Sequence, residues 1–363
     1  PLSMSETPSY VQIVKDTAHV VAPKANDITA VFYPKMLTNN PEVFKYFNKT
    51  NQRSGRQPTA LAAAVVAYAQ NIDNLGALTD AVTLMAHKHC ALGIQAEDYG
   101  VVHKNLMEAV AEVLGLDGNG DVAKGWSEAV LALAGVLINA EKELYASAEA
   151  RRGGWRGKRM FEVDEVVNEA RDVVSVYLKP QDGKDTPEFT PGQYITLVEN
   201  PSKDVLFAPR HYTISCRPSD AKDRLRITVK LLRGPTSSVE DGIMSSFVNK
   251  LKAGNVVALH PPFGVASIPY APPPAGEDGG AVVFLTAGIG ITTSVALAGL
   301  EIESGRRKAI FVHGDRSFES HPLAKEIAAT GCPCLFAYSA ADGAAAATGL
   351  PATVTVEAGA RLT

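Results

Sequence analysis

Cysteine is scarce in this sequence, and no apolar run is long. The 363 residues contain 4 cysteines, too few and too scattered for a disulfide framework, so we expect free thiols and a cytoplasmic location. The longest apolar run, Val130 to Ile138, is too short to cross a bilayer. The first residues also lack the basic-then-apolar pattern of a signal peptide. We therefore expect no stable membrane association.

The sequence also lacks an excess of basic residues. Lys and Arg number 35 against 39 Asp and Glu, and the net charge is −4. Because binding to nucleic-acid phosphates needs a clustered basic surface, this balance argues against a nucleic-acid partner. The chain is too long for one hydrophobic core, so we predict two or three domains. We expect a monomer.

The pattern of residues changes twice along the chain. Residues 9–149 are rich in alanine with helical spacing, and the glycine-rich basic stretch from Arg151 to Arg159 is typical of a linker. Short β-type runs follow, and after a second linker at 270–280 strands alternate with helices. We therefore predict a multidomain protein: an all-α domain at 1–150, an antiparallel β-barrel domain at 151–275 and an α/β parallel-sheet domain at 276–363.

Helical phase separates two neighbouring histidines of the first domain. Leu78, Val82 and Met85 step by four and three and predict one buried stripe. Adding four gives His89, which we expect to face the interior. His87 lies about 200° around the helix from that face, so we expect it to point away. A buried histidine of this kind is either a packed core residue or a ligand.

Two further stripes place polar groups near an apolar interior. Gln57 heads a stripe of Leu61, Val65, Tyr68 and Ile72. Tyr33 lies beside a stripe formed by three apolar residues, Ile28, Phe32 and Met36. Because buried polar groups need partners, a pocket with histidine on one side and Gln and Tyr on the other suits an iron that carries a bound diatomic ligand.

At this point the sequence resembles the globin module of flavohaemoglobins. The resemblance covers residues 9–149 and rests on the runs FYPKML from Phe32, NNPE from Asn39, FNKTNQ from Phe47 and HKH from His87. It implies haem b with His89 as the iron ligand. It also implies that Tyr33 and Gln57 donate hydrogen bonds to the distal ligand, and that Phe47, Leu61 and Lys88 contact the haem.

The resemblance further implies that Tyr99 and Glu141 tune the iron ligand. A carboxylate that accepts the far N–H of His89 gives the imidazole anionic character. The alternative for Glu141 is a solvated helix residue beside Lys142 and Glu143, and the sequence by itself favours that alternative. Pro34 departs from an uninterrupted helix, and we expect the helix to end or kink there.

Two short runs point to flavin chemistry. The run PGQY contains Gln193 and Tyr194, and the run RHYTIS begins at Arg210. On a strand, Arg210, Tyr212 and Ile214 share one face while His211, Thr213 and Ser215 share the other. An arginine suits a diphosphate through forked, charge-assisted hydrogen bonds.

Together these runs resemble the FAD domain of the ferredoxin-reductase type. The resemblance implies that Arg210 contacts the FAD pyrophosphate, that Tyr212 packs on the isoalloxazine and that Thr213 approaches the ring. The remaining FAD-binding residues that it implies are Gln193, Tyr194, His211, Met244 and Ser245. Alternatives from the residues themselves are an ordinary strand residue for His211 and a plain helix cap for Ser245.

A Gly-x-Gly turn follows the apolar strand at 282–286 and precedes a helix. Gly288 and Gly290 allow the backbone to approach a phosphate, and a helix start with Thr292 favours the anion. The turn resembles the NAD(P)H-binding turn of the same reductases. Members of that family continue beyond the equivalent of Thr363 with a Cys-Gly-Pro turn and a terminal aromatic residue, so we expect the NAD(P)H domain to be incomplete.

The combined resemblance implies a nitric oxide dioxygenase. In such an enzyme electrons pass from NAD(P)H to FAD to haem, and NO and O2 are converted to nitrate. One alternative is a globin that binds O2 or NO beside a reductase remnant without function. Another is a haem or ferric reductase with no role in NO chemistry.

Overall fold

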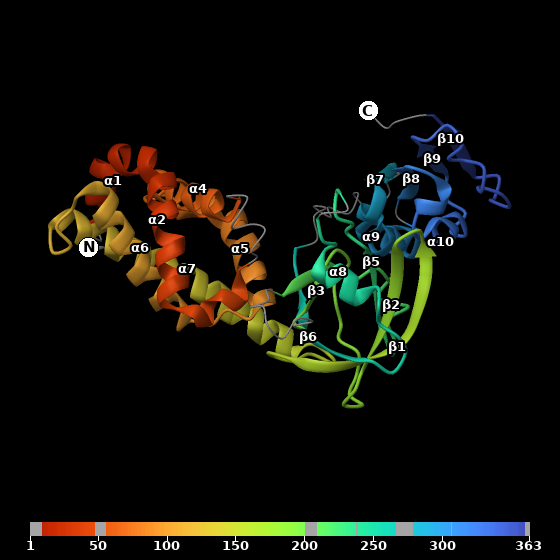
Figure 1. Cartoon of the computed structure of the whole chain (residues 1–363), viewed down its shortest axis with the longest axis horizontal. Coiled ribbons are helices and arrows are strands. Elements are labelled where there is room, and N and C mark those ends of the chain that lie inside the picture. Colours follow the sequence, from red (N-terminus) through yellow and green to blue (C-terminus); the bar gives the residue numbers. More distant parts are fainter. Residues whose placement is uncertain are drawn as a thin grey trace. The chain divides into compact units, whose positions relative to one another are not determined.

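The computed structural model describes residues 9–47, 56–199, 209–236, 239–265, 279–305 and 307–359. The chain divides into two compact units, a helical one that runs to Ser147 and a second one that begins at Ala148 (Figure 1). In the part of the chain that the structure describes, no helix is both long enough and apolar enough to cross a membrane.

The first unit consists of helices, as the alanine-rich spacing predicts. Its α-helices are α1 (Ser9–Val21), α2 (Ala25–Asn39), α4 (Arg56–Gln70), α5 (Thr79–Leu92), α6 (Asp98–Leu114) and α7 (Asp121–Ala150). Short 3-10 turns precede three of the helices, at η1 (Ala22–Lys24), η2 (Pro41–Tyr46) and η3 (Leu75–Leu78). The left-handed residues Gly93 and Gly115 end α5 and α6, because glycine adopts a positive φ without steric cost.

The core of this unit contains the predicted α2 stripe. Ile28, Phe32 and Met36 are each at most 4% exposed, and α2 packs against α4 and α6. Of the two outcomes expected at Pro34, an end of the helix is wrong, because α2 continues to Asn39. A kink at Pro34 stays a prediction. Proline removes one backbone hydrogen bond there, and the burial of three large side chains on the same helix offsets that loss.

The second unit begins with an antiparallel sheet. Its strands are β1 (Arg159–Ala170), β2 (Val173–Pro180), β3 (Tyr194–Leu197), β4 (Arg210–Thr213), β5 (Leu225–Lys230) and β6 (Val256–Phe263), and α8 (Ile243–Val248) lies between β5 and β6 in the chain. Among the described residues the strand order is β4-β3-β6-β1-β2-β5. Ile214 bridges Ile227 of β5, and the Ser215 N–H donates to the Arg226 carbonyl at 2.8 Å. The two outer strands therefore meet, as in the predicted barrel.

A parallel sheet completes the second unit. It contains β7 (Ala281–Ala287), β8 (Lys308–Asp315), β9 (Cys334–Tyr338) and β10 (Val354–Ala358), and the described strands follow the order β10-β9-β8-β7. The turn η4 (Gly288–Gly290) leads into α9 (Ile291–Ser304), and η5 (Phe318–Ser320) precedes α10 (Ala324–Ala328). Phe284, Phe311 and Phe336 occupy adjacent strands and are at most 5% exposed. This alternation of strands and helices confirms the predicted α/β half.

Two glycines of α7 lie in opposite environments. A Cβ atom built on Gly125 meets Cγ2 of Ile13 at 2.6 Å and its Cβ at 2.9 Å, so α1 and α7 approach closely at this point. A Cβ atom built on Gly135 meets nothing within 4 Å in the described part of the chain. The same substitution should therefore have opposite effects at the two positions.

We expect Gly125→Ala to lower the free energy of unfolding of the helical unit by about 1–3 kcal/mol, because the helices must move apart. Gly135→Ala, the matched control, should raise it by about 1 kcal/mol through helix propensity alone. Denaturant titrations followed by circular dichroism measure both changes. Stabilisation of both variants to the same degree would show that α1 and α7 are not in tight contact at Gly125.

Candidate functional site

Three helices of the first unit bring His89, Tyr99 and Glu141 together. His89 comes from α5, Tyr99 from the first turn of α6 and Glu141 from α7. Nδ1 of His89 lies 2.7 Å from Oε1 of Glu141 and 2.9 Å from the Tyr99 hydroxyl. The Tyr99 hydroxyl donates to the same carboxylate oxygen at 2.5 Å. The three side chains thus share one polar contact in an otherwise apolar region.

Glu141 is buried, and the reason is its place on α7. Leu137, Glu141 and Tyr145 follow at intervals of four, and each is at most 6% exposed. The alternative of a solvated helix residue is therefore wrong. The Tyr145 hydroxyl, which the sequence analysis missed, donates to the Ile94 carbonyl at 2.7 Å and ties α7 to the end of α5. The spacing of four residues from Leu137 to Glu141 and again to Tyr145 is the signal that could have revealed this face.

The electrostatics of this cluster determine which nitrogen of His89 remains available. The Glu141 carboxylate accepts hydrogen bonds, so the ring proton belongs on Nδ1 and Nε2 keeps its lone pair. Burial, and then the hydrogen bond to Glu141, raise the pKa of Tyr99 well above its usual range, so the phenol stays neutral. An imidazole whose Nδ1 is held by Glu141 leaves Nε2 for a metal, and this arrangement fits a ligand of haem iron.

The other residues of this helix segment lie outside the cluster. Ala86 and Cys90 carry the fully buried face of α5, whereas the side chain of His89 is 29% exposed and that of Lys88 is exposed. His87 makes none of the contacts that join His89 to Tyr99 and Glu141. The buried stripe predicted from Leu78, Val82 and Met85 is therefore wrong, since these three residues are only partly buried. That His87 points away from the cluster stays a prediction.

Tyr33 occupies a buried position on α2. Its side chain is 6% exposed, and its ring packs edge-on against Phe32 at 4.8 Å and against Phe47 at 5.8 Å between centroids. Burial raises the pKa of Tyr33 well above its usual range, so its hydroxyl keeps its proton. Leu61 on α4 packs against the same core. Gln57 is the second residue of α4, but its side chain is not among those that the structure describes.

In the second unit, β4 presents the residues that the sequence singled out for flavin. Arg210 and Tyr212 are half-buried on this strand. Burial lowers the pKa of Arg210, and burial raises the pKa of Tyr212 to about 12 against the opposing effect of Arg210. A guanidinium cation removed from water fits an anionic diphosphate. Thr213 pairs in register with Tyr194 of β3.

His211 lies on the other side of β4 and contacts its neighbouring strand. Its Nδ1 lies 2.8 Å from the Thr196 hydroxyl, and its ring is 4.8 Å from that of Tyr194. Gly264, with φ +118°, passes directly beneath Tyr194, because a Cβ atom there would meet Cε1 of the tyrosine at 2.8 Å. The backbone at Gly264 therefore determines where the Tyr194 ring can lie.

Gln193 and Ser245 use their polar atoms within the protein. The Gln193 amide accepts from the Thr190 N–H at 2.9 Å and donates to the Gly264 carbonyl at 3.2 Å. The Ser245 hydroxyl donates to the Gly242 carbonyl at 2.9 Å and accepts from the backbone of Leu232 at 3.1 Å. Gly242, not Ser245, precedes the first residue of α8, so the helix-cap alternative for Ser245 is wrong. Gln193 thus ties the segment before β3 to Gly264, and Ser245 ties α8 to the segment after β5. Met244 is buried.

The Gly-x-Gly turn joins β7 to α9. Gly288 has φ +50°, and Cβ atoms built on Gly288 and Gly290 meet nothing within 4 Å among the described residues. The Thr292 hydroxyl donates to the Ile289 carbonyl at 3.0 Å, which holds the first turn of the helix. Open space over two glycines at the start of a helix of 14 residues fits a nucleotide phosphate.

Comparisons with known proteins agree with both units. The globin family matches residues 30–137, and the oxidoreductase FAD-binding domain matches residues 160–268. A flavohemoprotein of Bordetella pertussis is 37% identical over 322 residues, which are 88% of this chain and 78% of that protein. A flavohemoprotein of Bacillus subtilis is 34% identical and covers 87% and 76% of the two chains.

One solved structure matches nearly the whole chain. A flavohemoglobin from Malassezia yamatoensis, described with bound FAD and heme, has a TM-score of 0.76 and 25% identity. The alignment covers 97% of this chain and 91% of that one. The order of a helical unit, an antiparallel sheet and a parallel sheet is therefore shared with a known architecture.

Tyr99 should make the protein sensitive to alkali. Because its pKa is raised in the folded state, the unfolded chain loses this proton first, and stability falls as pH rises above the ordinary tyrosine value of about 10. One such group lowers the free energy of unfolding by at most about 1.4 kcal/mol per pH unit. We expect Tyr99→Phe to be less stable at neutral pH but to decline less steeply above pH 10. Urea unfolding across that pH range measures the slope, and equal slopes would contradict the raised pKa.

Proposed function

The chain belongs to the flavohaemoprotein family of oxidoreductases, and we propose that it is an NAD(P)H-dependent nitric oxide dioxygenase that detoxifies NO. The observation that carries this proposal is the contact of His89 with Glu141 and Tyr99. A globin that only stores O2 needs an axial histidine, but a buried carboxylate on that histidine serves oxygen activation. O2 and NO are the proposed substrates, and nitrate is the product.

When bound, haem supplies the iron at which O2 and NO react, and FAD supplies electrons taken from NAD(P)H. His89 would hold the iron through Nε2. Glu141 accepts a hydrogen bond from Nδ1–H of His89 and would thereby raise the basicity of the nitrogen that holds the iron. Tyr99 fixes the carboxylate oxygen that makes this contact. The carboxylate therefore acts on the iron through the imidazole.

We assign Tyr33 the role of hydrogen-bond donor to the ligand that a haem iron would bind. Its phenol is kept neutral by burial, so it has a proton to donate. Phe47 packs against this ring and, with Leu61, would contact the haem. Gln57 is the second proposed donor, which follows from the family resemblance, and Lys88 is assigned to the haem rim on the same basis.

In the second unit the proposed roles follow from the family resemblance, and the partial burial of Arg210 and Tyr212 on β4 supports them. Arg210 binds the FAD diphosphate, Tyr212 packs on the flavin and Thr213 approaches its ring. Gln193, Tyr194, His211, Met244 and Ser245 shape the rest of the FAD site. Gly288, Gly290 and Thr292 bind the NAD(P)H diphosphate through backbone N–H groups at the start of α9.

Replacing the iron ligand tests the assignment against a neighbour on the same helix. His89→Ala should lose the haem absorbance and the NO consumption of the purified protein, because no other group in the cluster can replace Nε2. His87→Ala, the matched control, should keep both. Native NO consumption in His89→Ala, or equal loss in both variants, would contradict the proposal.

Glu141→Gln separates an activating role from simple haem binding. The amide can still accept the Nδ1 proton but carries no charge, so haem should stay bound while NO consumption falls about tenfold or more. The iron–histidine stretching frequency in resonance Raman spectra should fall with it. Glu143→Gln removes an exposed carboxylate two residues away and should change neither quantity. Unchanged NO consumption in Glu141→Gln would contradict the activating role of the carboxylate.

A further inference from the structure

Charges of opposite sign face each other where the barrel meets the parallel-sheet half of the second unit. The barrel contributes Arg171, Arg217 and Arg226, and the parallel-sheet half contributes Glu303, Glu319 and Glu326. Arg226 reaches Glu326 with two nitrogens at 2.6 and 2.9 Å, and Arg217 lies 3.6 Å from Glu303. Arg171 pairs with Glu319. All three pairs have their cation on the barrel.

Only one of these three cations is buried. The side chain of Arg226 is 7% exposed, against 40% for Arg217 and 62% for Arg171. Exposed pairs are screened by solvent and contribute little, whereas a buried charge depends on its partner. Burial works to lower the pKa of Arg226, but the hydrogen bonds and charge of Glu326 hold it above its usual value. The guanidinium is thus a fixed cation with a forked contact.

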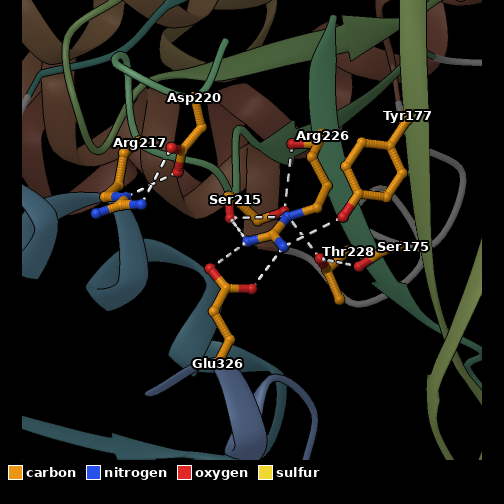
Figure 2. A network of polar contacts seen from close by, with 8 residues as sticks. All are labelled: Ser175, Tyr177, Ser215, Arg217, Asp220, Arg226, Thr228 and Glu326. Atoms are coloured by element: carbon orange, nitrogen blue, oxygen red, sulfur yellow. Dashed lines mark hydrogen bonds and ion pairs between the residues drawn. The ribbon is translucent and has the colours of Figure 1, made fainter. Parts of the chain in front are cut away.

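The same guanidinium also holds the end of the β4 segment, as Figure 2 shows. Its Nε donates to the Ser215 carbonyl at 3.1 Å, and Nη2 donates to the same oxygen. The Ser215 hydroxyl lies 2.8 Å from that of Thr228, which is 2.8 Å from that of Ser175. Ser215 follows β4 by two residues. Arg226 therefore links the strand of Arg210 and Tyr212 to helix α10.

The strand of Arg226 also touches the candidate nucleotide turn. β5 contacts both β4 and the Gly288–Gly290 turn. Nearby, a Cβ atom on Gly299 of α9 would overlap the Arg217 side chain, so α9 lies tightly against the barrel there. The two candidate cofactor sites of this unit thus share one strand and one buried ion pair.

We propose that Arg226, through Glu326, is a positioning residue that holds the nucleotide-binding half in register with the flavin-binding strand. The inference rests on the proposed function, in which two electrons and a proton pass from NAD(P)H to FAD, oxidising the nicotinamide and reducing the flavin. Such a transfer depends steeply on the distance and orientation of the two rings. A shift of α10 relative to Ser215 therefore slows it without removing either cofactor.

Glu326→Gln tests this role with the least risk to folding, since residue 326 is partly exposed. In the full chain loaded with haem and FAD, we expect both cofactors to stay bound. At saturating NADH or NADPH, the anaerobic flavin reduction rate should fall about tenfold or more in stopped-flow measurements. Arg226→Lys, which keeps the charge but not the fork, should fall in the same direction. Glu319→Gln removes the exposed pair with Arg171 and should match the wild type.

Hydrogen exchange supplies a readout that does not depend on the reaction. In Glu326→Gln, amide protection should drop in residues 323–329 and also around Ser215, while Glu319→Gln leaves both segments unchanged. A lower melting temperature with an unchanged limiting rate of flavin reduction would overturn the positioning role. If neither NADH nor NADPH reduces the flavin of the wild-type protein, the proposed electron path is contradicted instead.

Hydrogen exchange then decides the positioning role. Unchanged amide protection in Glu326→Gln overturns that role, and reduced amide protection supports it.

Discussion

The buried Glu141 carboxylate of the helical unit requires polar partners, and the surrounding helices have to supply them. Glu141 is 3% exposed, and a buried charge that loses its partner costs about 3–5 kcal/mol. His89 and Tyr99 provide the compensating contacts, and they come from two other helices. Helices α5, α6 and α7 must therefore meet at one point before the charge is stable. The orientation of the histidine follows from this requirement.

The second unit applies the same principle at a different scale. Apolar strands can pack in many ways with similar free energies. The guanidinium of Arg226 is more selective, because it donates to Ser215 and Glu326 together in only one arrangement of the two. A buried ion pair is weak support for stability and better support for a unique geometry, a role we assign here as a hypothesis. In each unit a buried ionic group therefore lies at a point where separate elements must meet in one orientation.

The sequence predicts most of what depends on local spacing. The stripe of Ile28, Phe32 and Met36 is buried as its period requires, and the α/β half follows from the alternation of strands and helices. The expectation of a helix end at Pro34 failed because the propensity of one residue was weighed without the packing of the whole helix. The residue roles proposed at β4 and at the glycine turn remain predictions.

Local sequence patterns do not predict contacts between residues that are far apart in the sequence. Arg226 and Glu326 are 100 positions apart, and neither belongs to a motif. Glu141 illustrates an intermediate case, since its charged neighbours favoured a solvated residue while its interval of four from Leu137 and Tyr145 indicated a buried one. Burial of a charge becomes predictable only when its partner is known, and the partners here come from other helices.

Gly264 has a consequence for how mutations in this protein would be interpreted. Its positive φ excludes most side chains, and the Tyr194 ring excludes even a methyl group, so two independent constraints leave glycine as the tolerated residue. A substitution there would displace an aromatic side chain that lies against β4, the strand proposed to bind the flavin. In a saturation screen for activity, position 264 would score like a binding residue although it has no side chain to bind with. Intolerance to mutation and contact with a cofactor are different properties, and this glycine separates them.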